Sequence, residues 1–183
     1  MKHIQSIKSV VLFLVILVSM TSCTTEDLGR SGNKAAVSVS LRSTSTDVSE
    51  VFLDIEDVQL KVGQSPSESW ISLNAINTGT HNISDLTEAS ALLLVDHIEI
   101  DPTYINEVKL VLGDNNFMNI NNVLVNLERD ESTIASNLVQ RAFEGSYIYQ
   151  LIIDIDIDQS IEFNEATNAM VLNPKLQTEI RKF

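Results

Sequence analysis

Alternation of apolar and polar residues dominates the stretch from Gln150 to Phe163. One parity carries Leu151, Ile153, Ile155 and Ile157, and the other carries Ile152, Asp154, Asp156 and Asp158. A period of two places each set on one face of a β-strand, whereas a helix would scatter the aspartates around its cylinder. We therefore predict a long, half-buried strand with the first set in a core and the second in water.

Shorter alternating segments occur along most of the remaining chain. They predict strands at 37–41, 51–62, 70–73, 82–86, 108–112, 118–120, 123–127, 138–143, 170–172 and 176–180. Only 87–94 is compatible with a helix, of one or two turns. The pattern shows no internal repeat and no strand–helix–strand spacing, so the predicted fold is an all-β, antiparallel β-sandwich, immunoglobulin-like or related.

Three local patterns predict how strands bend or connect. The apolar parity changes between Val51–Ile55 and Val58–Val62, which requires an extra residue, and we expect a β-bulge near Glu56-Asp57. Residues 113–116, Gly-Asp-Asn-Asn, have the chemistry of a turn. Asn121-Asn122 can form a tight two-residue reversal between two strands.

The first 22 residues have the pattern of a signal peptide. Lys2 and Lys8 precede the apolar run Val10–Val18, which is too short to span a bilayer. The sequence Met-Thr-Ser-Cys that ends at Cys23 resembles the lipobox of bacterial lipoproteins, in which the cysteine receives lipid and the preceding peptide is removed. Cys23 is thus the predicted lipid attachment site and membrane contact.

The predicted domain organisation follows from this signal. Residues 1–22 are the signal peptide, 23–34 form a polar tether, and 35–183 form the β-sandwich domain. Glu26 and Asp27 resemble the acidic surface-export signal of some Gram-negative lipoproteins. We therefore expect an outer-membrane lipoprotein of a Gram-negative bacterium that is surface-exposed or else faces the periplasm.

The net charge of the chain excludes nucleic acid as a partner. Removal of residues 1–22 takes away Lys2 and Lys8 and no acid, so the formal net charge of −13 becomes −15. Such a chain repels nucleic acid, and no basic patch offsets the repulsion. Cys23 is the only cysteine, so a lipidated chain has neither a disulfide nor a free thiol.

Five stretches together resemble one family, the lipoprotein domain of unknown function DUF4382. They are 51–58 (VFLDIEDV), 83–87 (ISDLT), 108–116 (VKLVLGDNN), 151–161 and 172–176 (LNPKL). The resemblance covers about residues 36–180 and implies a β-sandwich in an exported, lipid-anchored setting, with no established activity. The chain departs from the family at 42–45, Arg-Ser-Thr-Ser, where the family commonly has an Asp-Ala-Pro step.

The alternating aspartates invite comparison with a calcium site. Asp154 and Asp156 could join Asp114 from a neighbouring loop around Ca²⁺, which takes six to eight oxygen ligands. Carboxylates on one strand face stand about 6.7 Å apart, however, so a single strand cannot converge them on one ion. We interpret them as a solvated face and expect no metal and no other cofactor.

The sequence contains no recognisable catalytic motif. Gly-x-Ser-x-Gly, the phosphate-binding loop and His-Glu-x-x-His are all absent. We therefore expect a non-catalytic binding or structural module whose ligand is a glycan or an envelope protein. The alternative is a hydrolase that cleaves envelope or dietary polysaccharide through paired carboxylates.

Overall fold

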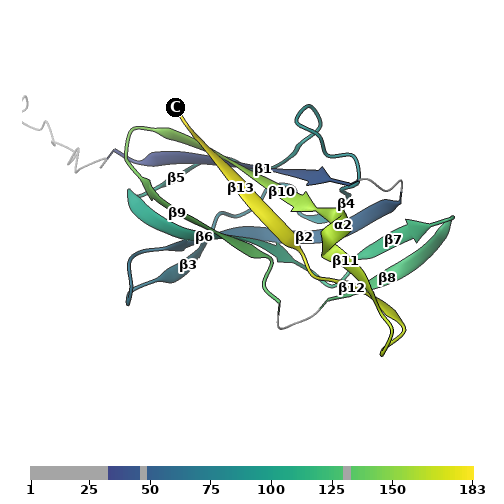
Figure 1. Ribbon diagram of the computed structural model, residues 1–183. Helices are drawn as coiled ribbons and strands as arrows, with labels where there is room; N and C mark the ends of the chain where they lie inside the picture. Colours follow the sequence, from purple (N-terminus) through teal and green to yellow (C-terminus); the bar gives the residue numbers. More distant parts are fainter. Residues whose placement is uncertain (1–32, 46–48, 130–132) are drawn as a thin grey trace, which may run out of the picture. The chain divides into compact units, whose positions relative to one another are not determined.

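A computed structural model describes residues 33–45, 49–129 and 133–183, all of which belong to one compact unit, Gly32–Phe183. This unit is built from two β-sheets (Figure 1), and both contribute buried side chains to one apolar core. The predicted all-β sandwich is therefore confirmed. The predicted signal peptide 1–22 and nearly all of the tether 23–34 lie outside the described residues.

The smaller sheet has four strands in the order β13-β10-β1-β5. Their bounds are β1 Ala35–Thr44, β5 Leu92–Ile100, β10 Ile148–Asp156 and β13 Lys175–Lys182. The central pair, β1 and β10, is parallel, and both outer pairings are antiparallel. Ala36, Ile148 and Lys182 therefore lie toward one end of this sheet, while Thr44, Asp156 and Lys175 lie at the other.

The larger sheet has nine strands and follows the order β11-β12-β8-β7-β2-β6-β9, with β3 and β4 both paired to β2. Its bounds are β2 Glu50–Val62, β3 Ser69–Ser72, β4 Gly79–Asn82, β6 Thr103–Leu112, β7 Phe117–Ile120, β8 Val123–Arg129, β9 Ser136–Phe143, β11 Ile161–Asn164 and β12 Ala169–Leu172. The β8–β12 pair is parallel, so both sheets are mixed. The prediction of a wholly antiparallel fold was wrong in this respect, because periodicity reveals strands but not their relative direction.

The core lies between the inward faces of the two sheets. Val37, Val39 and Leu41 of β1 and Leu151, Ile153 and Ile155 of β10 are each at most 1% exposed. Full burial of an aliphatic side chain of this size contributes roughly 1.5–3 kcal/mol. At one end of the core, Tyr149 stacks on Phe143 with ring centroids 4.0 Å apart, and its hydroxyl accepts a hydrogen bond from the Glu144 amide. The alternating pattern thus correctly identified the inner faces of these strands.

The predicted bulge and the predicted tight reversal are both present. Ile55 pairs with Leu112 and Asp57 with Val111, which leaves Glu56 as the extra residue in β2. Asn121 and Asn122, between β7 and β8, have φ angles of 52° and 66°. Asparagine tolerates this left-handed conformation, which matches the twist of a two-residue hairpin.

Residues 113–116 form a bulged loop rather than a chain reversal. They join β6 to β7, and both strands run antiparallel along the same edge of β2. Asn116, only 1% exposed, replaces the missing strand residues: its Oδ1 accepts from the Asp54 amide at 2.9 Å, and its Nδ2 donates to the Gly113 carbonyl at 2.7 Å. A Cβ at Gly113 would meet the carboxylate of Asp54, so a larger residue here would have to displace that side chain.

The long strand predicted at 150–163 is interrupted. β10 ends at Asp156, a single helical turn α2 spans Ile157–Ser160, and β11 then continues in the other sheet. Asp156 caps α2 by accepting from the Gln159 amide at 3.0 Å and from Gln159 Nε2 at 2.7 Å. An acid followed three residues later by Gln is an N-cap pattern. Here a helical turn forms at this pattern, although the alternation of residues predicts that the strand continues.

Two predictions for residues 82–94 were wrong. The strand expected at 82–86 lies earlier, at Gly79–Asn82, and 83–91 is a loop. No helix forms at 87–94, because Ser90 closes a local turn by accepting from the Thr87 amide through Oγ and donating to the Asp85 carbonyl. Leu92–Ile100 forms β5 instead, a strand without sustained alternation that the sequence pattern did not indicate.

Replacement of Asn116 with alanine is expected to destabilise the fold by about 1–3 kcal/mol, since it leaves the Asp54 amide and the Gly113 carbonyl without their partner. Its neighbour Asn115 is exposed and bonds Thr80 at 3.1 Å, so Asn115→Ala should change stability by less than about 0.5 kcal/mol. Urea unfolding of both variants measures the difference. Equal costs would contradict the role assigned to Asn116.

Candidate functional site

The candidate site is a hollow of about 560 Å³ on the outward face of the smaller sheet. Strands β1, β10 and β13 form its floor, α2 lies at one end, and the loop 83–91 forms a wall. Its charged and amide residues are Arg42, Glu88, Asp154, Asp156, Gln159, Lys175 and Gln177. Leu86 adds an apolar contribution from the loop, whereas Leu176 pairs with the inward-facing Ile155 and packs against the core. The size lies within the range of small-ligand sites.

Strand register explains why these side chains gather. Asp154 pairs with Arg42 of β1 on one side and with Gln177 of β13 on the other. Asp156 likewise lies between Thr44 and Lys175. Because directly paired residues of adjacent strands project to the same face, three strands deliver their polar positions to one surface.

The strongest contact in the hollow joins Arg42 to Asp154. Arg42 Nε and one terminal nitrogen donate to the two carboxylate oxygens of Asp154, both at 2.7 Å. The two side chains are only 19% and 28% exposed. This bidentate geometry is the strongest form of an arginine–carboxylate pair and holds both groups in one plane.

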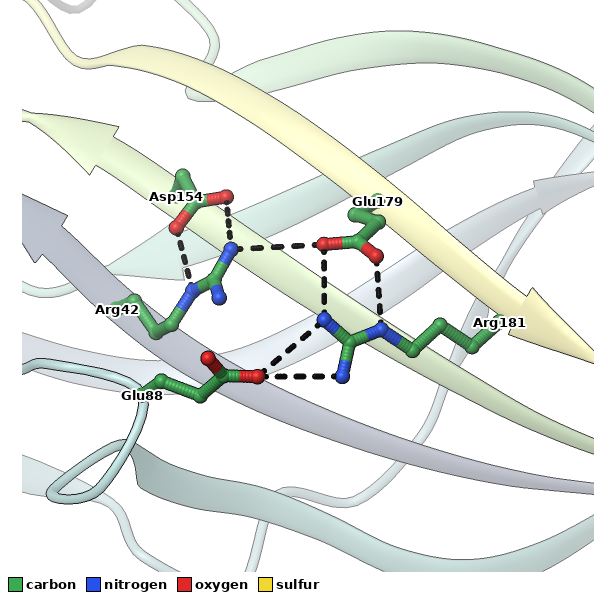
Figure 2. Close-up of polar contacts among 5 residues, drawn as sticks. All are labelled: Arg42, Glu88, Asp154, Glu179 and Arg181. Carbon is green, nitrogen blue, oxygen red and sulfur yellow. Dashed lines mark hydrogen bonds and ion pairs between the residues drawn. The ribbon is translucent and has the colours of Figure 1, made fainter.

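The pair extends into a network of five residues, which we call the ionic network (Figure 2). Arg42 also lies 3.6 Å from Glu179, and Glu179 accepts from Arg181 Nε at 2.7 Å. Arg181 in turn lies 3.4 Å from Glu88 in the loop. The ionic network therefore connects β10, β1, β13 and the wall of the hollow.

These contacts shift the pKa values of the charged groups. The hydrogen bond from Arg181 is the main reason why the pKa of Glu179 is lowered, against the opposing effect of desolvation. The pKa of Arg42 is raised, chiefly by its hydrogen bond to Asp154, and that of Arg181 by its bond to Glu179. The ionic network thus favours the charged form of these three groups near neutral pH.

Ile152 departs from its expected environment. It has the parity of Asp154 and was predicted to face water, yet it is 3% exposed. It pairs with Ser40 and Glu179, so it lies beside the ionic network on the outward face.

The wall of the hollow is attached to β1 by Ser43. The Ser43 amide donates to the Leu86 carbonyl at 2.8 Å, and the Leu86 amide donates to Ser43 Oγ at 3.3 Å. Ser43 Oγ also donates to the Ile83 carbonyl. Arg42 and Ser43 both belong to the stretch 42–45, where the sequence departs from the family pattern, so this departure falls at the hollow.

The three residues considered for calcium each have another partner. Asp154 is bound by Arg42, Asp156 caps α2, and Asp114 lies 3.3 Å from Arg129. Asp154 and Asp156 line the hollow together, whereas Asp114 lies in the loop between β6 and β7 of the other sheet. Among the described residues, no group of three or more His, Cys, Asp or Glu side chains could hold a metal ion.

Other expected functional features lie partly or wholly outside the described residues. Cys23, Glu26 and Asp27 are among them, so the predicted lipid attachment and export signal stay predictions. In the part of the chain that the structure does describe, no helix has the length and apolar character needed to cross a membrane.

Sequence reasoning missed most of the ionic network. Glu88, Glu179 and Arg181 were not singled out, and Arg42 was noted only as a departure from the family pattern. One signal was available on β13, where Lys175, Gln177, Glu179 and Arg181 alternate with Leu176, Thr178 and Ile180. The partners of these side chains depend on the register between strands, which no local pattern specifies.

The pKa of Glu179 predicts acid sensitivity. Its pKa in the folded state is lowered below the ordinary value of 4.5, so the unfolded chain binds more protons in that pH range. Its stabilising effect is present above the unfolded pKa and is lost as pH falls through the folded one. Thermal unfolding should therefore show that Glu179→Gln is less stable than the wild type at pH 6 and that the gap closes toward pH 3.

The matched control is Glu162→Gln, which alters an exposed residue of β11 outside the ionic network. Its difference from the wild type should stay small at both pH values. If the stability difference between Glu179→Gln and the wild type is the same at pH 3 as at pH 6, the lowered pKa of Glu179 does not contribute to stability.

Divalent cations provide a test of the solvated-face interpretation. Because Arg42, Arg129 and the α2 amide group already bind the candidate aspartates, we expect 1 mM Ca²⁺ and 1 mM Mg²⁺ to shift the melting temperature equally and slightly. A site with a Kd near 10 µM would instead add about 2.7 kcal/mol at that concentration. A calcium-specific rise abolished by Asp156→Asn or Asp114→Asn would overturn this interpretation.

Comparisons with known proteins identify a family but no function. No curated protein matches the chain, and no solved structure matches it either. The family model described as "Domain of unknown function (DUF4382)" matches residues 34–174, from just before β1 to the residue before β13. This match covers most of the chain and almost the whole sandwich. The chain therefore belongs to the DUF4382 family.

Proposed function

We propose that this protein is a lipid-anchored module of the bacterial cell envelope that binds a ligand in the hollow without chemical conversion. The anchor would be Cys23 in the outer membrane of a Gram-negative bacterium, with the domain exposed at the surface or else facing the periplasm. The ligand would be a glycan or an envelope protein. The single observation that carries the binding role is the hollow and its internally paired charges.

The position of the hollow supports presentation away from the membrane. The tether joins the sandwich at Ala35, where β1 begins, and the hollow includes Arg42, Ser43 and Thr44 at the opposite end of that strand. A ten-residue strand spans about 30 Å. If Cys23 is anchored in the membrane, the hollow therefore lies at the end of β1 that is farther from the tether.

The state of the carboxylates favours binding over hydrolysis. A glycoside hydrolase needs one carboxyl group with a raised pKa as proton donor and a second to act as base or nucleophile. In the hollow, Asp154 is held by Arg42 and Asp156 caps α2, and in the adjoining ionic network the pKa of Glu179 is lowered. Paired, charged carboxylates of this kind are suited to accept hydrogen bonds from a ligand rather than to donate a proton.

The anchor is tested by replacement of Cys23 with serine. The wild-type protein should incorporate a fatty-acid analogue during growth and remain with the membrane fraction, because the thioether-linked lipid holds it there. Cys23→Ser should lose the label and either be released or keep its signal peptide. Label that persists on the Cys23→Ser protein would contradict the proposed anchor.

A further inference from the structure

The hollow combines opposite charges that nearly cancel. Its lining and the adjoining ionic network place Arg42, Lys175 and Arg181 beside Glu88, Asp154, Asp156 and Glu179. The chain as a whole carries a formal net charge of −13. A bound anion would be repelled by the surrounding field, and a bound cation would compete with Arg42 for Asp154. The charge balance therefore favours a neutral ligand.

The available hydrogen-bonding groups suit a ligand with many hydroxyls. Asp154 accepts two hydrogen bonds from Arg42, and a carboxylate has about four lone-pair sites, so it retains acceptor capacity. Gln177 adds an exposed amide on β13, and Thr44 and Thr87 add exposed hydroxyls from the floor and the wall. Donors and acceptors are thus intermixed, as hydroxyl groups that both donate and accept require.

The location of the hollow disfavours an extended peptide. Peptides that bind β-proteins commonly add a strand to a sheet edge, where backbone groups are free. The hollow lies on the face of its floor strands; β10 at its centre is paired along both edges, and among the described residues the only free strand edge of the floor is the outer edge of β13. Recognition on this face therefore depends on side chains. Leu86, half-buried in the wall, offers aliphatic surface against which the C–H groups of a sugar ring can pack.

We infer that the hollow binds a neutral glycan, with one or two sugar units seated on Asp154, Gln177 and Leu86. The inference rests on the proposed binding function and narrows its ligand to one class. The Arg42–Asp154 pair acts as a rigid acceptor whose charge is already compensated, so a neutral hydroxyl can bind it without an uncompensated charge being buried.

The test uses the full-length lipoprotein purified in a zwitterionic, sugar-free detergent. Calorimetric titration would use neutral oligosaccharides of glucose, mannose, galactose, xylose and N-acetylglucosamine, with an oligogalacturonate as the acidic probe. At least one neutral oligosaccharide should bind with a Kd below about 1 mM, equally at 50 and 500 mM salt. Gln177→Ala should weaken this binding about tenfold or more.

The control is Gln64→Ala, which removes an exposed amide outside the hollow and should leave the affinity unchanged. Three results would overturn the inference: no binding by any neutral oligosaccharide, equal binding by Gln177→Ala, or tighter, salt-sensitive binding of oligogalacturonate. If no glycan binds but Cys23-dependent labelling is observed, the inference of a glycan ligand is wrong and the proposed anchor stands. Release of new reducing ends would instead reject the non-catalytic function.

Discussion

The parallel pairing of β1 with β10 is the contact on which the rest of this fold depends. It joins residues 36–44 to residues 148–156 and forms the centre of the smaller sheet. Its inward side chains are fully buried in the core, which makes the pair a large source of hydrophobic stabilisation. The same register sets Arg42 opposite Asp154 on the outward face. One pairing thus defines both the core and the floor of the hollow.

Strands with clear alternation were predictable, because the order of apolar and polar residues within a strand indicates which of its faces is buried. The parity change in β2 located the bulge at Glu56, and Asn121-Asn122 located the reversal between β7 and β8. Prediction failed where two local preferences compete. The Asp156–Gln159 cap ends a strand that alternation would continue, and the apolar run that begins β5 lacks the alternation that marks a strand. The parallel pairs were also missed, since strand direction is a property of topology.

In the candidate site, too, features set by neighbouring residues were predictable, whereas contacts between residues distant in the sequence were not. Asp154 and Asp156 were singled out from the sequence, and their outward orientation on β10 was correct for both. Their interpretation as a solvated face overlooked Arg42 and Glu179, which are distant in sequence and arrive through strand pairing. Ile152 is 3% exposed on this same face, where it pairs with Ser40 and Glu179. A face can therefore be polar and still bury an aliphatic side chain.

The mixed topology also has a consequence for how the chain folds. β1 is made first, yet its neighbour β10 lies more than a hundred residues later in the sequence, and β13, near the C-terminus, completes the sheet. Such a high contact order delays folding until most of the chain is available. The nascent polypeptide cannot complete its smaller sheet early in synthesis. Residues 36–44 of β1 are therefore without their parallel partner until Asp156 has been added to the growing chain.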